Sequence, residues 1–172
     1  MADLKQVLDQ FRLKGELVTH VTSWRVLEAH PAEYGQMPPE LAPRLADMLA
    51  AQGIKQLYVH QVRAVQEVLA GHNVVIVTPT ASGKTLCYNL PVLNALLHDR
   101  QVRALYLFPT KALAHDQLSH LQESAAFLGL DDCIAAYDGD TLAGARAQIR
   151  TSARILLSNP DMLHAGILPY HT

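Results

Sequence analysis

Short apolar runs alternate with helix-length amphipathic patterns from about residue 74 onward, and this alternation limits the fold more than any other feature of the sequence. Apolar strands separated by helices are typical of a parallel sheet with helices on both faces. The sequence therefore predicts an α/β domain. The expected strands cover residues 74–77, 104–108, 134–137 and 155–157, and the expected helices cover residues 84–98, 110–127 and 142–150, with a short helix opening at Pro160.

The first part of the chain has a different pattern, and residues 1–54 are predicted to form a helical N-terminal extension with a linker. Residues 17–38 show no sustained period and contain two prolines and a glycine, so they are expected to be irregular. The main domain is expected to span residues 55–172. The other expected elements are helices at residues 4–11, 39–51 and 59–70, glycine stops at Gly15, Gly53 and Gly71, and an extended piece near residues 18–21.

Composition and charge narrow the functional classes. The chain is 49% hydrophobic and carries a net charge of −2, with the charges spread evenly, so any nucleic-acid binding must be local. No apolar run approaches the roughly 20 residues that cross a bilayer, and charged residues in the first ten positions argue against a secretory signal. A cytoplasmic protein that does not contact the membrane is expected. Cys87 and Cys133 lie far apart and are expected to be reduced thiols.

The segment Thr78-Pro79-Thr80-Ala81-Ser82-Gly83-Lys84-Thr85 lies between a predicted strand and a predicted helix, and it is typical of a phosphate-binding loop. In such a loop the backbone amides and the helix N-terminus face the phosphates of ATP, the lysine reaches the terminal oxygens, and the hydroxyl binds Mg²⁺. Thr78 stands where the first glycine is usual. The alternative is an ordinary turn, but a cation such as Lys84 in a first helical turn opposes the helix dipole.

Two residues upstream of this loop are candidates for binding the adenine base. Gln61 has a side-chain amide that can pair with adenine N6 and N7, and Tyr58 has a ring that can stack on the base. The alternative is that Gln61 is a surface residue of the 59–70 helix.

Two later strand ends carry helix-capping sequences that also form possible anion sites. Pro109-Thr110-Lys111 offers a capping threonine and a lysine, and Asn159-Pro160-Asp161 opens the last helix in the same way. Capping alone would explain both. Residues 137–141, Tyr-Asp-Gly-Asp-Thr, are more typical of a turn than of a metal site, and the stripe of Arg146 and Arg150 is by default a solvated face.

Taken in order, these segments resemble the first half of a superfamily 2 helicase, over about residues 55–172. The details are most similar to the DExH-box DNA helicases of the mitomycin repair factor group, relatives of the RecQ-like enzymes. The resemblance implies a RecA-like domain that binds ATP and Mg²⁺ and moves along single-stranded DNA. It also implies that the DNA backbone is contacted by Pro109, Thr110, Lys111, Asn159, Pro160 and Asp161. It implies a role in DNA repair, with Lys84 and Thr85 as catalytic residues and nucleotide contacts from Tyr58, Gln61, Thr80, Ala81, Ser82 and Gly83.

The sequence departs from the resembled family in one respect. No Asp-Glu-x-His segment occurs up to Thr172, so the carboxylates that orient the attacking water are not in this chain. The RecA-like domain is therefore expected to be incomplete, without useful ATP hydrolysis, and prone to aggregate because its sheet lacks central strands. A small-molecule kinase and a non-catalytic nucleotide- or DNA-binding module remain alternatives.

Overall fold

The computed structural model describes residues 3–25, 27–28 and 31–170, and the chain divides into two compact units, Met1–Ala32 and Glu33–Thr172. In the first unit, α1 (Leu4–Leu13) begins where the Asp3 carboxylate accepts a hydrogen bond from the Lys5 amide at 3.4 Å. The next helix, α2 (Gly15–Val18), takes up the start of the piece that the sequence predicted to be extended, so that prediction is wrong at Val18. No side chain of α1 is buried.

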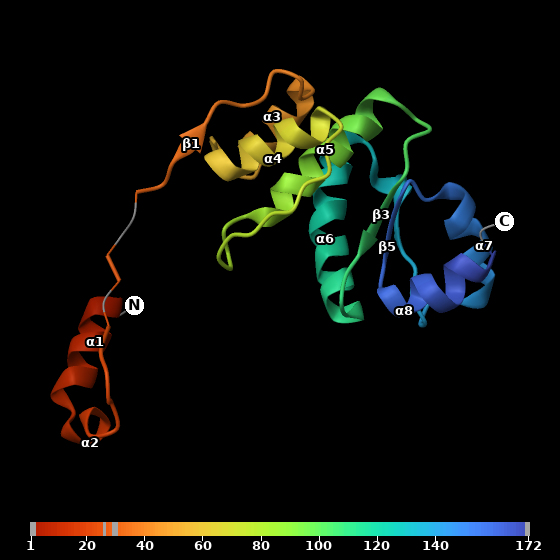
Figure 1. The fold of residues 1–172 in the computed structure, drawn as a ribbon. Helices are drawn as coiled ribbons and strands as arrows, with labels where there is room; N and C mark the ends of the chain where they lie inside the picture. Colours follow the sequence, from red (N-terminus) through yellow and green to blue (C-terminus); the bar gives the residue numbers. More distant parts are fainter. Residues whose placement is uncertain (1–2, 26, 29–30, 171–172) are drawn as a thin grey trace. The chain divides into compact units, whose positions relative to one another are not determined.

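The first part of the second unit combines helices from the predicted N-terminal extension, before residue 55, with helices from the predicted main domain. It contains β1 (Tyr34–Gly35), α3 (Pro43–Ala51), β2 (Leu57–Tyr58), α4 (Val59–Leu69) and α5 (Lys84–His98). Figure 1 labels all of these except β2. Leu45 and Leu49 of α3 are fully buried in the same core cluster as Leu90 and Leu93 of α5. The helix α3 therefore lies in the second compact unit, because its apolar face is part of the main core.

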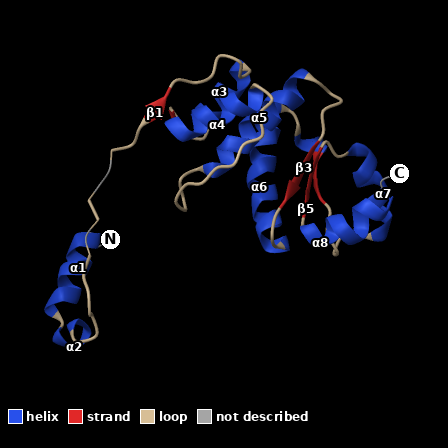
Figure 2. Cartoon of the chain, in the orientation of Figure 1, coloured by secondary structure: helices blue, strands red, loops and turns tan. Residues whose placement is uncertain are grey.

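The α/β architecture predicted from the sequence is confirmed. The strands β3 (Ala104–Leu107), β4 (Ile134–Ala136) and β5 (Ile155–Ser158) form a parallel sheet in the order β3-β5-β4. The central strand β5 is the most buried, since Ile155 and Leu157 have no exposed surface. Figure 2 shows α6 (Lys111–Leu128) on one side of this sheet and α7 (Ala143–Ser152) and α8 (Pro160–Met162) on the other.

The first predicted strand, residues 74–77, does not form, and that prediction is wrong. The segment is extended, with Val74 and Ile76 partly buried and Val75 and Val77 90% and 89% exposed, but it makes no strand pairing among the described residues. Figure 1 shows it as part of the long loop between α4 and α5. A strand exists only through hydrogen bonds to a neighbour, and the three-stranded sheet places no strand beside this segment.

The chain's last described part follows β5. The short α8 continues into a π-helical turn, Leu163–Ile167, and a 3₁₀ turn, Leu168–Tyr170. Within the described part of the chain, no helix combines the length and the apolar character needed to cross a membrane.

Candidate nucleotide and nucleic-acid sites

The loop that precedes α5 has the backbone of a phosphate-binding turn. Ala81 and Gly83 both have positive φ, +60° and +74°, and Gly83 is the N-cap residue of α5. A Cβ atom on Gly83 would lie 2.5 Å from Nε2 of Gln61, so a larger residue would have to displace the end of that side chain and would also strain a backbone with positive φ. The first amides of α5 have no carbonyl of their own helix to bond, which makes them possible donors to an anion.

Lys84 is folded back over this loop. Its ammonium group donates hydrogen bonds to the carbonyl oxygens of Thr78 at 2.9 Å and Pro79 at 2.7 Å, and it lies 3.4 Å from the Thr78 hydroxyl. Thr78 Oγ1 and Ser82 Oγ are 2.6 Å apart and close the loop from the same side. The Lys84 ammonium donates to neutral carbonyl oxygens, and an anion that reached it would be a stronger acceptor than either of them.

Two consecutive side chains of α4 hold the loop from the opposite side. Gln61 donates from Nε2 to the Gly83 carbonyl oxygen at 2.9 Å and accepts the Tyr58 amide at 2.9 Å, which forms the N-terminal capping box of α4. His60 Nε2 lies 3.0 Å from the Ser82 carbonyl oxygen. The predicted base-binding residue Gln61 is therefore only 2% exposed, with one donor and one acceptor position left.

A cavity of about 510 Å³ adjoins the loop, lined by Tyr58 and Gln61 together with Ala81 and Gly83. The same cavity is lined by Tyr34, which the sequence analysis placed in an irregular linker and missed. Its ring stacks on that of Tyr58 with centroids 5.1 Å apart and an interplanar angle of 15°. Pairing between β1 and β2 brings these rings together, and Gly35 permits it, because a Cβ there would meet Val62 at 2.9 Å. The only feature of the sequence that could have pointed to Tyr34 is the glycine that follows it, which allows the close packing against Val62.

The structure also brings the two predicted nucleic-acid segments to one edge. Leu107 pairs with Ser158 and Ala136 with Leu157, so the three parallel strands end side by side. Residues 109–111, 137–141 and 159–161 follow these ends. Thr110 caps α6 by accepting the Leu113 amide at 3.2 Å, and Asn159 caps α8 by accepting the Met162 amide at 2.8 Å.

The turn after β4 is organised by the buried carboxylate of Asp138, which is 4% exposed. It accepts the Asp140 amide at 2.9 Å and lies 2.9 Å from Nε2 of His115 on α6. Burial by itself raises the pKa of Asp138, but the hydrogen bonds from His115 and the Asp140 backbone and the charges of His115 and Lys111 outweigh it, so the pKa lies below its ordinary value.

The cation expected at this edge is paired. Lys111 Nζ lies 3.0 Å from the Asp140 carboxylate, with both side chains largely exposed. Asn159 is almost completely buried and uses its side-chain oxygen for capping, so among the predicted contacts at this edge Lys111 is more accessible than Asn159.

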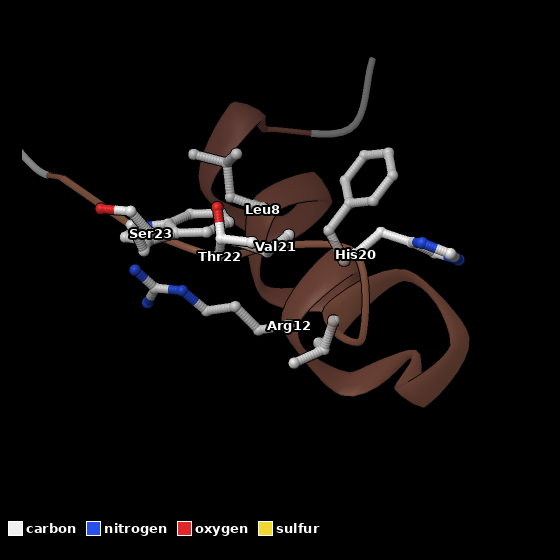
Figure 3. Close-up of a pocket in the computed structure, with 9 residues that line it drawn as sticks. Leu8, Arg12, His20, Val21, Thr22 and Ser23 are labelled. Atoms are coloured by element: carbon white, nitrogen blue, oxygen red, sulfur yellow. The ribbon is translucent and has the colours of Figure 1, made fainter.

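The N-terminal unit contains a separate apolar groove of about 740 Å³ (Figure 3). Leu8, Phe11, Val18, Val21 and Trp24 contribute its apolar lining, and the Arg12 guanidinium lies 4.6 Å from the centre of the Trp24 ring. None of the residues predicted to bind nucleotide or nucleic acid lies in it.

Comparison with known proteins identifies the family. The family model described as DEAD/DEAH box helicase matches residues 58–171, about two thirds of the chain. The match includes every residue that the sequence predicted to bind nucleotide or nucleic acid. The chain belongs to the DEAD/DEAH box helicases. The resemblance drawn from the sequence is thereby confirmed.

Among helicases of this family, the chain is 49% identical over 160 residues to the uncharacterized ATP-dependent helicase YprA of Bacillus subtilis. This match covers 93% of this chain and 21% of YprA. It is 34% identical over 169 residues to the ATP-dependent helicase hrq1 of Schizosaccharomyces pombe, covering 96% of this chain and 16% of hrq1. The chain thus spans about a fifth of the length of the curated relatives it matches.

A solved structure of the DUF1998 helicase MrfA bound to DNA and AMPPNP is similar over 99% of this chain and 23% of MrfA, with a TM-score of 0.89 and 44% sequence identity. This similarity agrees with the RecA-like architecture of the sheet and its helices.

Proposed function

We propose that this chain is part of an ATP-dependent DNA helicase, in which it binds ATP and Mg²⁺ at the 78–85 loop and single-stranded DNA at the carboxyl edge of the sheet. One observation carries the proposal: the open helix N-terminus, the Lys84 ammonium and a cavity with stacked tyrosines meet at one loop. The relatives named ATP-dependent helicases, and the MrfA structure with DNA and AMPPNP, support it.

The residues of the loop fit a nucleoside triphosphate. Lys84 would exchange the carbonyl oxygens of Thr78 and Pro79 for phosphate oxygens, which are charged and therefore stronger acceptors. The Thr85 hydroxyl would bind Mg²⁺, which neutralises charge on the phosphates during phosphoryl transfer. Tyr58 and Gln61, with Tyr34 added by the structure, would hold the base in the adjoining cavity.

The carboxyl edge of the sheet fits a nucleic-acid backbone. Lys111 and the helix start capped by Thr110 lie where a phosphate would find both a cation and open amides. Such contacts read no base, and a motor that moves along DNA must hold every sequence equally. A local edge of this kind is compatible with the chain's net charge of −2.

The test uses the full-length helicase with Lys84→Ala and, as matched control, Lys5→Ala on the exposed face of α1. Lys84→Ala is expected to lower the rate of DNA-stimulated ATP hydrolysis by a factor of about 10³ or more and to leave the circular dichroism spectrum unchanged. Lys5→Ala is expected to leave hydrolysis unchanged. Normal turnover by Lys84→Ala would refute the proposal, and phosphorylation of a small metabolite without DNA stimulation would favour a kinase instead.

The 172-residue chain itself is expected to bind nucleotide without hydrolysing it. It has no Asp-Glu-x-His segment to orient an attacking water. Hydrolysis by the 172-residue chain at the rate of the full-length helicase would show that other carboxylates do this work.

A further inference from the structure

We propose that His60 is a positioning residue of the phosphate loop, which it holds through the Ser82 carbonyl so that the Gly83 amide faces the phosphates. The inference rests on the proposed function, because it assumes that phosphates bind at this loop. His60 directly precedes Gln61 in the chain, but it was not among the residues predicted from the sequence to bind the nucleotide.

The contact itself shows which atom of the ring is the hydrogen-bond donor. His60 Nε2 lies 3.0 Å from the Ser82 carbonyl oxygen, and a carbonyl oxygen can only accept a hydrogen bond. Nε2 therefore carries a proton and donates it to Ser82. The ring has little freedom to turn away, because it stacks on Tyr58 with centroids 5.7 Å apart and an interplanar angle of 11°. Tyr58 stacks in turn on Tyr34, so three rings support the donor.

The consequence for the loop follows from the planarity of the peptide bond. In a trans peptide the carbonyl of one residue and the N–H of the next point in opposite directions, and no cis peptide is found in the described residues. Fixing the Ser82 oxygen toward α4 therefore turns the Gly83 N–H away from α4. Gln61 does the same one peptide later: it holds the Gly83 oxygen at 2.9 Å, which turns the Lys84 N–H away from α4.

His60 and Gln61 thus orient two successive amides at the N-terminus of α5. Gly83 needs such support more than other residues, because glycine has the widest choice of backbone conformations and here keeps a φ of +74°. Amides that are aimed before the ligand arrives bind it more tightly, since less conformational freedom is lost on binding. His60 is expected to act on nucleotide affinity and to contribute little to the chemical step.

The experiment separates the two contacts of the ring in the full-length helicase. His60→Gln keeps an N–H donor and loses the aromatic ring, His60→Phe keeps the ring and loses the donor, and His60→Ala loses both. His72→Ala is the matched control, because His72 lies just past the other end of α4, is exposed, and pairs with Glu67 rather than with the loop. Two quantities are measured: hydrogen–deuterium exchange of residues 79–85 without nucleotide, and the Kd of a fluorescent non-hydrolysable ATP analogue.

Faster exchange in the loop and an affinity loss of about 3- to 10-fold are expected for His60→Ala and His60→Phe, which corresponds to one hydrogen bond. His60→Gln is expected to restore most of both, and His72→Ala to change neither. In steady-state hydrolysis the KM for ATP should rise while kcat stays nearly constant. Wild-type exchange in His60→Phe, or a fall in kcat with an unchanged KM, would overturn the inference.

Failure of the inference is distinguishable from failure of the proposed function. If Lys84→Ala does not weaken binding of the analogue, the nucleotide site is not at this loop and the proposed function fails. If Lys84→Ala weakens binding but His60→Phe behaves as wild type in both measurements, the inference alone fails. Should His60→Ala not fold, the comparison of His60→Phe with His60→Gln decides.

Discussion

At the scale of single residues, Asp138 shows how one buried carboxylate fixes a turn. Its two oxygens bind the Asp140 amide and the His115 ring, while the Asp138 amide donates to the Thr141 hydroxyl at 2.9 Å. A buried charge with these partners is stabilising only while it remains ionised. A neutral acid still accepts hydrogen bonds, but it lacks the charge that strengthens the contacts with the Asp140 amide and the His115 ring, so it would hold the turn less firmly.

Because the pKa of Asp138 is lowered in the folded protein, its stabilising contribution is fully present above the unfolded-state value near pH 4 and is lost as the pH falls through the lower folded value. We predict that Asp138→Asn weakens the turn by about 1–2 kcal/mol at neutral pH. In the full-length protein the variant should reduce the protection of residues 138–142 against hydrogen–deuterium exchange several-fold, and the loss of protection that the wild type shows below about pH 4 should be absent from the variant.

The control for this prediction is Asp116→Asn, an exposed carboxylate on α6 that does not touch the turn. It should leave exchange of residues 138–142 unchanged. Equal protection of the turn in Asp138→Asn and the wild type would show that the carboxylate charge does not organise it.

At the scale of elements, the start of α6 and the turn after β4 share one ion pair. Lys111 is held by Asp140, so a DNA phosphate at this edge has to compete with a carboxylate of the same protein. We predict opposite effects of the two partners in the full-length helicase: Lys111→Ala weakens binding to single strands of every sequence, and Asp140→Asn tightens binding by about 2- to 5-fold at low salt.

Salt titration of DNA affinity, measured by fluorescence anisotropy, checks this. The slope of log Kd against log salt concentration should fall by about 0.7 in Lys111→Ala, the value for one single-strand phosphate contact. The gain in Asp140→Asn should disappear at high salt, because exposed charges are screened. Weaker binding in Asp140→Asn would mean that the ion pair supports the DNA site instead of competing with it.

At the scale of the whole molecule, the segment 74–77 exposes apolar side chains of the main unit to solvent. Val75 and Val77 are almost fully exposed, and the segment makes no strand pairing among the described residues. An unpaired extended edge of this kind is a template for pairing with another chain. This agrees with the expectation that the 172-residue chain aggregates when it is alone.

Replacing both valines by lysine is therefore predicted to reduce aggregation of the 172-residue chain, raising the temperature at which light scattering begins by several degrees. Leu142→Lys serves as the control, because Leu142 is equally apolar and 77% exposed but lies outside an extended segment. Aggregation that responds equally to both changes would assign it to surface hydrophobicity in general. A reversible, cooperative thermal transition of the unsubstituted chain would contradict the expectation itself.

The sequence predicted well those features that are written locally. Helix α5 was expected at residues 84–98 and is found there, because its start is marked by Gly83 and its apolar positions repeat with helical spacing. The caps at Thr110 and Asn159 were likewise legible, since a capping side chain binds an amide only three residues away. The prediction for residues 74–77 failed because local apolar character measures only the tendency to pair.

The sequence by itself determined the helical faces and the loop that ends in Gly83-Lys84-Thr85, because each depends on neighbours within a few positions. It also indicated the parallel sheet, because apolar runs alternate with helices along the chain. Only the tertiary structure decided that Tyr34 joins Tyr58, that α3 belongs to the main core, and that His60 meets the Ser82 carbonyl. These contacts join residues more than twenty positions apart, or elements across a core, and they form because packing, not local preference, brings the segments together.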